Sequence, residues 1–307
     1  MSFLRSLCSL AALLLCALRC STANDRPLPL PAEIQERVVV MEKEVESAFA
    51  KAPRGMERAV LMRELTASEG EEIRRLSPSD CPVGVWGLVV LEIKYRGENG
   101  SARFGRVIAP RYCDVDLVKV NHPMTQEAYR KAIEGESVKK AAAEDLVEFF
   151  EDNYRRQDYL PMDWIIPYHY FMETAPQLGV SPDELSMRCN NSYSFAPRRV
   201  RDTGLWSRHT FGAIDLNPFY NPAIVPTKVG KAEGLDLSEA GPEALTLGLV
   251  QIEPSTSSGF AFNRTSRRTG YLLAPSSAAV RFFSKRGWTW GGNFVNVRDY
   301  QHFGIAE

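Results

Sequence analysis

Apolar positions along the chain recur with two different periods, which predict helices in some segments and strands in others. Within residues 33–51 they are spaced by three and four, as on one face of an amphipathic helix. The same reasoning predicts helices over residues 56–65 and 137–154. A short helix is expected over residues 277–285, with Gly287 just beyond its end, where glycine is common.

Residues 85–95 instead alternate between apolar and polar side chains, which is the period of a half-buried strand. Asn99-Gly100 is a hairpin signal because both residues tolerate positive φ, so residues 104–109 are expected to form the returning strand. Residues 224–268 are rich in Gly, Pro, Ser and Thr, and they are expected to form a long irregular loop with little core of its own. Strands, a hairpin and helices without a regular βαβ rhythm predict an α+β fold.

The first residues have the features of a secretory signal peptide. One positive charge precedes an apolar run over residues 7–18, which is too short to span a membrane comfortably, and Ser21-Thr22-Ala23 provides small residues for cleavage. Residues 1–23 are therefore expected to be removed, which makes the protein secreted or periplasmic. The alternatives are an N-terminal membrane anchor and a lipid-modified Cys20, although Arg19 fits the second poorly.

The balance of charged residues argues against a protein that coats nucleic acid. The chain has 307 residues, of which 37 are basic and 38 acidic, so it lacks the positive excess of proteins that coat nucleic acid. The segment from 189 to 307 holds 13 basic and 9 acidic residues, with clusters at 198–201 and 264–268. These clusters are either a solvated surface or a site for an acidic ligand.

The cysteines beyond the signal segment are Cys81, Cys113 and Cys189. Export permits disulfides, but three cysteines allow at most one bridge within a chain, and the pair stays open. None of the three is in a C-x-x-C, so a cysteine-based metal cluster is not expected.

Two segments, 206–218 and 287–303, contain the candidate chemistry. They hold two of the four histidines and two aspartates in apolar, glycine-rich sequence. Two histidines and one carboxylate make a known catalytic zinc shell, and Asp299 lies three residues before His302, close to whatever His302 binds. Residue type alone does not decide this, because most histidines in proteins are exposed or simply hydrogen-bonded.

The order of residues in these segments resembles the zinc D-alanyl-D-alanine carboxypeptidase and L-alanyl-D-glutamate endopeptidase family. That family includes the vancomycin-resistance D,D-peptidases and shares its fold with the Hedgehog signalling domain. Its S-x-H-x-x-G-x-A-x-D motif is matched by Ser207, His209, Gly212 and Asp215. Its W-x-W-G-G and acid-x-x-His-Phe motifs are matched by Trp288, Trp290, Gly291, Gly292, Asp299, His302 and Phe303. An upstream stretch over residues 186–198 also resembles secreted members of the family.

The resemblance implies a role for each matched residue. Zinc would be held by His209, Asp215 and His302, with Asp299 as the general base that activates water. Arg198 would steady the developing oxyanion or a substrate carboxylate, because a guanidinium pairs bidentately with either.

Further residues and the domain limits follow from the same resemblance. Ser207 and Trp290 are candidate substrate-binding residues, with core packing as the alternative for Trp290. His122 and His169 match no ligand position and are expected to be structural or exposed. The expected organisation is a signal peptide (1–23), an N-terminal helical extension (24–66), and a Hedgehog-like, D,D-peptidase-like domain (67–307) of antiparallel sheet with flanking helices.

One departure affects the metal site, since His209 and Asp215 are six residues apart where the family has seven. A one-residue slip in extended chain turns a side chain to the opposite face. Either the loop around Gly212 absorbs the change through unusual backbone angles, or the zinc site is distorted. The family's Glu after His-Phe is also replaced, here by Gly304.

The sequence therefore predicts a zinc metallopeptidase that cuts a bond in peptidoglycan stem peptides. Carboxypeptidase and endopeptidase activity both stay open, and residues 224–268 are expected to set the depth of the pocket. The alternative is a catalytically degenerate member that binds cell-wall peptides or a partner protein. A serine D,D-peptidase is disfavoured, because S-x-x-K at Ser137–Lys140 is followed by neither S-D-N nor K-T-G.

Overall fold

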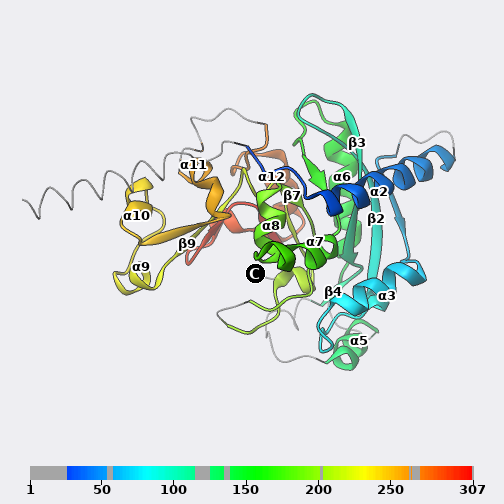
Figure 1. The fold of residues 1–307 in the computed structure, drawn as a ribbon, viewed down its shortest axis with the longest axis horizontal. Helices are drawn as coiled ribbons and strands as arrows, with labels where there is room; N and C mark the ends of the chain where they lie inside the picture. The colour runs from blue at the N-terminus through cyan, green and yellow to red at the C-terminus, as the bar shows by residue number, and fades with distance from the viewer. Residues whose placement is uncertain are drawn as a thin grey trace, which may run out of the picture.

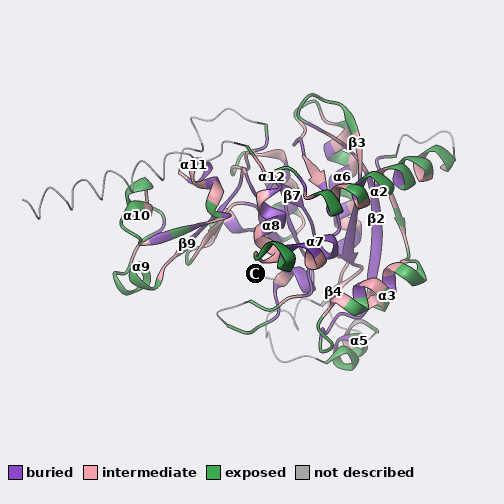
Figure 2. Cartoon of the chain, in the orientation of Figure 1, coloured by how far each residue is buried: buried purple, intermediate pink, exposed green. Residues whose placement is uncertain are grey.

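The longest strands form the hairpin that residue alternation and the Asn99-Gly100 turn predict. The computed structural model describes residues 26–53, 58–114, 125–134, 139–200, 203–262, 264 and 270–305. In it, β2 (Leu88–Arg96) pairs antiparallel with β3 (Ala102–Pro110) along its whole length. Gly100 has a φ of 78°, so the turn uses the backbone freedom that glycine provides. The hairpin lies in one half of the molecule (Figure 1). Its first strand, β2, is almost wholly buried (Figure 2).

The third strand of this sheet comes from a segment for which the sequence predicts a helix. β1 (Val60–Arg63) pairs antiparallel with β2, with Val60 opposite Ile93. The helical prediction is wrong for these residues, because a short apolar run shows no clear period and the edge of β2 offers it backbone hydrogen bonds. The segment expected to be a helical extension, 24–66, thus contains a strand of the main sheet.

Helix α2 (Ala32–Lys51) confirms the pattern predicted over residues 33–51. Its buried residues, all at most 1% exposed, are Ile34, Val38, Met41 and Val45. They belong to an apolar cluster with residues of α7 (His169–Thr174) and α8 (Pro182–Arg188), and the helix also lies along β3. Helix α2 therefore supports α7 and α8, and α8 extends to the cleft described below.

One core joins this sheet to a second, smaller one. Helix α6 (Ala142–Arg155) packs on β2, and its Phe149 ring lies 4.7 Å, between centroids, from that of Phe283 in α12 (Ala278–Lys285). The second sheet has the order β11 (Trp288–Trp290), β13 (His302–Ile305) and β8 (Ala213–Asp215), with both pairs antiparallel. Both helices are confirmed, although α6 begins five residues later than predicted.

Residues 223–262 form a lobe that projects from the main body, where the sequence predicts an irregular loop (Figure 1). Its elements are β9 (Ala223–Pro226), α9 (Lys228–Ala232), α10 (Pro242–Thr246), β10 (Val250–Glu253), η4 (Ser255–Ser257) and α11 (Ser258–Ala261). An apolar cluster that includes Ile224, Leu237 and Ile252 lies inside it, so the prediction of little core is wrong. Elements of three to five residues are too short to show a period.

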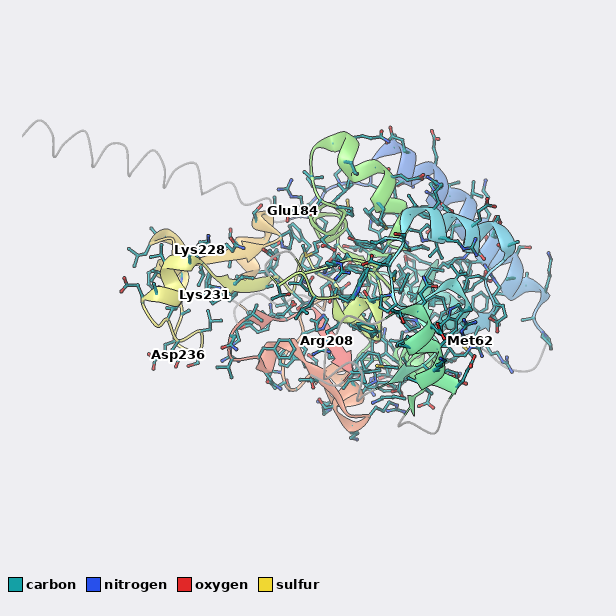
Figure 3. The ribbon with its side chains drawn as sticks, turned by 90° about the horizontal axis from the view of Figure 1, so that it is seen from below. Met62, Glu184, Arg208, Lys228, Lys231 and Asp236 are labelled. Atoms are coloured by element: carbon teal, nitrogen blue, oxygen red, sulfur yellow. The ribbon has the colours of Figure 1, made fainter. Side chains whose placement is uncertain are left out.

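The lobe is joined to the C-terminal strands, because β9 pairs with both β10 and β12 (Arg298–Asp299). In Figure 3, Lys228, Lys231 and Asp236 mark the far end of the lobe and Met62 marks the opposite end of the molecule, with Glu184 and Arg208 between them.

Short elements complete the chain: α3 (Ala67–Leu76), η1 (Val85–Gly87), β4 (Cys113–Asp114), α5 (Gln126–Glu134), β5 (Lys139–Lys140), β6 (Trp164–Ile165), η2 (Ala175–Leu178), β7 (Asn191–Ser192), η3 (Arg208–Thr210) and η5 (Gly291–Asn293). β6 and β7 pair in parallel, and every other described strand pair is antiparallel. Helices and several small sheets make this an α+β protein, as predicted.

The three cysteines beyond the signal segment are all buried, and none forms a disulfide. Within the part of the chain that is described, no helix combines the length and the apolar character needed to cross a bilayer. The predicted signal segment, Cys20, His122 and Ser137 lie outside the described residues.

Candidate metal centre and cleft

The three predicted metal ligands meet where β8 and β13 pair. Asp215 ends β8, His302 begins β13, and the antiparallel register places the two directly opposite each other. Opposed residues project to the same face of a sheet, so His302 Nδ1 lies 3.0 Å from Asp215 Oδ1. His209 Nε2 lies 3.1 Å from the same oxygen. All three side chains are buried, and one donor atom from each lies within 4.8 Å of the others.

A short turn orients His209. The residue lies in η3, and Ser207 Oγ at the start of that turn accepts a hydrogen bond from the His209 backbone N–H at 3.3 Å. The ring Nδ1 lies 2.7 Å from the Ser194 carbonyl oxygen, which can only accept, so Nδ1 is the protonated nitrogen. When the ring is neutral, Nε2 therefore presents its lone pair on the side of Asp215, in the way that proteins commonly orient metal-binding histidines. When the ring is protonated, Nε2 donates to Asp215 Oδ1 instead.

The donor set fits a small divalent cation. With His209 neutral, its Nε2 and the Asp215 oxygen are two acceptors 3.1 Å apart, an arrangement that a cation between them would stabilise. In a tetrahedral site with bonds of about 2.0–2.1 Å, neighbouring donors are about 3.3 Å apart, close to the spacing seen here. Burial raises the pKa of Asp215, but His209 and His302 more than offset it, so the pKa lies below its ordinary value and the carboxylate is anionic.

The short spacing between His209 and Asp215 does not keep these side chains apart. Gly212, expected to absorb it through unusual backbone angles, is not among the residues with positive φ. Its role is steric instead, because a Cβ there would lie 3.1 Å from Ile305 Cδ1 and 3.3 Å from Cys113 Cβ. Strand β8 follows the turn of His209 closely and still delivers Asp215 to the site.

A cleft of about 760 Å³ contains the three candidate ligands and three further predicted residues. Asp299, on β12, and Arg198 both line it, as does Ser207. The lobe contributes one wall through Ala223, Val225, Gln251 and Glu253, and α8 contributes to another. Residues from four separate parts of the chain thus meet around the triad of His209, Asp215 and His302.

The C-terminal part of this site also has a recognisable sequence. Residues 201–305 match the family described as D-alanyl-D-alanine carboxypeptidase. This segment is a domain of that family. The match covers about a third of the chain and includes His209, Asp215, Asp299 and His302. No curated protein and no solved structure matches the chain.

Arg198 precedes the carboxypeptidase domain but lies in its cleft. Its Nε forms a 2.8 Å ion pair with Asp183 Oδ1 on α8, and its carbonyl oxygen accepts a hydrogen bond from the Ser207 N–H at 2.9 Å. Burial lowers the pKa of Arg198, but Asp183 more than offsets this, so the pKa lies above its ordinary value. A permanent positive charge is therefore held beside the triad.

The two candidate substrate-binding residues of the carboxypeptidase domain lie in different surroundings. Ser207 lines the cleft, where its hydroxyl caps the turn that carries His209. Trp290 is 3% exposed, belongs to the main core and donates from its indole N–H to the Tyr300 carbonyl at 2.9 Å. Core packing, the alternative weighed for Trp290, is the one that its surroundings favour.

The basic clusters in and beside the carboxypeptidase domain do not form one surface. Arg199 pairs with Asp80 and lies over the Trp206 ring, whereas Arg264 is half-buried and donates to backbone carbonyls. Arg201, Arg267 and Arg268 lie outside the described residues. His169, expected to be structural or exposed, is buried in α7, and burial lowers its pKa to about 3.

Sequence reasoning missed the residues that surround the ligands. The Tyr193 ring stacks on His209 with centroids 4.9 Å apart, and the Tyr168 ring lies 5.0 Å from Tyr193 on the other side. Asp183 accepts a hydrogen bond from each tyrosine hydroxyl, at 3.0 Å from Tyr168 and 3.5 Å from Tyr193. All three precede the matched segment, and only Tyr193 lies within the family-like stretch over residues 186–198.

Proposed function

We propose that the protein is a zinc metallopeptidase that hydrolyses a peptide bond in peptidoglycan stem peptides, of the D,D-carboxypeptidase or L-alanyl-D-glutamate endopeptidase type. The observation that supports this most directly is the convergence of His209 and His302 on one buried oxygen of Asp215, inside a cleft. The family of residues 201–305 supplies the substrate class.

The residues of the chain take distinct parts in this proposal. His209, Asp215 and His302 would hold one Zn²⁺, which when bound lowers the pKa of water and polarises a carbonyl. Asp299 lines the same cleft and accepts the proton of the attacking water as general base. Arg198 stabilises negative charge on the substrate, either a terminal carboxylate or the developing oxyanion.

The proposal also covers the cellular location of the protein and its fold family. Residues 1–23 would act as a cleaved signal that delivers it to the periplasm or outside the cell, where peptidoglycan is accessible. We also propose that the sheet β11-β13-β8, with ligands on two adjacent strands, is the core of a Hedgehog-like, D,D-peptidase-like fold. A solution structure of the expressed protein would test that fold.

Mass spectrometry of muropeptides incubated with the purified protein tests the activity. Loss of a terminal D-alanine is expected for a carboxypeptidase, and separation of L-alanine from the rest of the stem is expected for an endopeptidase. A chelator should abolish either change and added zinc should restore it. Muropeptides that bind without any change in mass would support the alternative, a cell-wall peptide-binding module without turnover.

Substitutions test the individual roles. His302→Ala is expected to lose both zinc and hydrolysis, whereas Asp299→Ala keeps zinc and loses turnover. Asp236→Ala, which removes an exposed carboxylate on the lobe, is the control and should keep both. A wild-type protein purified without zinc would contradict the metal assignment, and an Asp299→Ala rate equal to wild type would contradict the base.

A further inference from the structure

One oxygen of Asp183, at the edge of the candidate metal centre, accepts from two tyrosine hydroxyls and forms an ion pair with Arg198. Its Oδ1 lies 2.8 Å from Arg198 Nε, 3.0 Å from the Tyr168 hydroxyl and 3.5 Å from the Tyr193 hydroxyl. We propose that Asp183 is a positioning residue, which holds the Arg198 guanidinium and the Tyr193 ring in place for catalysis. This inference rests on the proposed function.

The ion pair places the guanidinium in a particular orientation. Asp183 contacts Nε of Arg198, which leaves the end of the group with its two Nη atoms available to a substrate. That end is the one that meets a carboxylate or an oxyanion with two parallel hydrogen bonds. The Arg198 side chain is 30% exposed in the cleft, so a long, flexible side chain would take several rotamers without Asp183.

Asp183 also reaches a proposed metal ligand through Tyr193. Tyr193 stacks on His209, and its backbone pairs with Asp215 through N–H to O contacts of 3.2 Å and 3.0 Å. One residue thus contacts both His209 and Asp215, and Asp183 restrains its hydroxyl. A single carboxylate therefore relates the position of the guanidinium to the position of two ligands.

A simpler role for Asp183 must be separated from this one. The residue lies in the first turn of α8, where any carboxylate stabilises a helix through its charge. Glu184 is the next residue in the same turn, but its carboxylate pairs with Arg188 and contacts Ser255. Asp183→Asn and Glu184→Gln both remove one charge from the same helix turn, so they form a matched pair.

The direct test is the NMR signal of the Arg198 Nε–H in the zinc-loaded, ¹⁵N-labelled protein, assigned by its loss in Arg198→Lys. Wild type should show a signal protected from exchange with water. Asp183→Asn should shift it and speed its exchange, while Glu184→Gln should leave it unchanged. An Arg198 signal that is the same in Asp183→Asn and wild type would overturn the proposal. This readout needs no substrate, so it separates failure of the proposal from failure of the proposed function.

Kinetics with muropeptides then test the consequence. Asp183→Asn should lower kcat/KM by about 10- to 100-fold with the zinc content unchanged, and Asp183→Glu should recover part of the loss. If Asp183 acts through Arg198, adding Asp183→Asn to Arg198→Ala should cause little further loss. Losses that multiply in the double variant, or a loss in Asp183→Asn explained wholly by lost zinc, would overturn it.

Discussion

Replacing Val38 by alanine tests whether helix α2 supports the wall of the cleft. Val38 is fully buried, in a cluster with Phe171 of α7 and Leu185 of α8, two residues after Asp183. Val40, two positions along the same helix, is 58% exposed. Replacing valine by alanine raises helix propensity equally at both positions. Any difference in stability between Val38→Ala and Val40→Ala therefore reports the difference in burial of the two side chains.

The expected magnitude follows from the atoms removed. Valine to alanine deletes two carbon groups, each worth about 0.8 kcal/mol when buried, and the cavity left behind adds to the cost. Val38→Ala should thus lower the free energy of unfolding by about 2 kcal/mol. Val40→Ala should change it by less than about 0.5 kcal/mol, as is usual for exposed sites. For a chain of this size, the first loss lowers the melting temperature by roughly 3 °C.

Urea unfolding followed by circular dichroism measures both variants under the same conditions. Equal shifts in the unfolding midpoint would refute the reasoning, since they would mean that the buried face of α2 contributes nothing beyond helix formation. If Val38→Ala unfolds earlier, muropeptide hydrolysis well below its melting temperature should still match wild type. That result would show that α2 acts on stability and leaves the geometry of the folded site unchanged.

Three further changes have defined outcomes. Gly212→Ala should lower the free energy of unfolding by about 1–3 kcal/mol in urea, because its Cβ would lie 3.1 Å from Ile305; unchanged stability would contradict that packing. The pKa of His169 is lowered to about 3, so below its ordinary value of 6.5 the unfolded chain gains a proton that the folded chain excludes. Between pH 7 and pH 5, wild type should therefore lose about 2 kcal/mol more than His169→Gln, and equal losses would contradict the assignment. Zinc at a hundred times its Kd should stabilise wild type by about 2.7 kcal/mol in thermal unfolding but not Asp215→Asn, and an equal shift would place the ion elsewhere.

Periodicity predicted the elements that are long enough to display it. Helix α2 has 20 residues and β2 and β3 have nine each, so several turns or alternations report the same buried face. β1, β9 and β10 have four residues each, and they become strands because a neighbouring strand supplies their backbone hydrogen bonds. That neighbour is distant in sequence, so no local pattern could predict the lobe.

Some residues of the candidate site were likewise predictable from the sequence, and others were not. Motif spacing pointed to His209, Asp215, Asp299 and His302, because these residue types recur together in a known family. Asp183 was not predicted, since a carboxylate in the first turn of a helix is ordinary and its arginine lies 15 residues away. Only the packing of α8 against the segment that contains Arg198 brings the two together.

The six-residue spacing between His209 and Asp215 proved less important than strand register. A slip of one residue between β8 and β13 would turn Asp215 away from His302. That slip would also move Ile214 and Phe303 out of the main core, where both are fully buried and directly paired. The apolar residues beside Asp215 and His302 therefore hold the register. The position of Asp215 opposite His302 is thus determined by the same burial that folds the sheet.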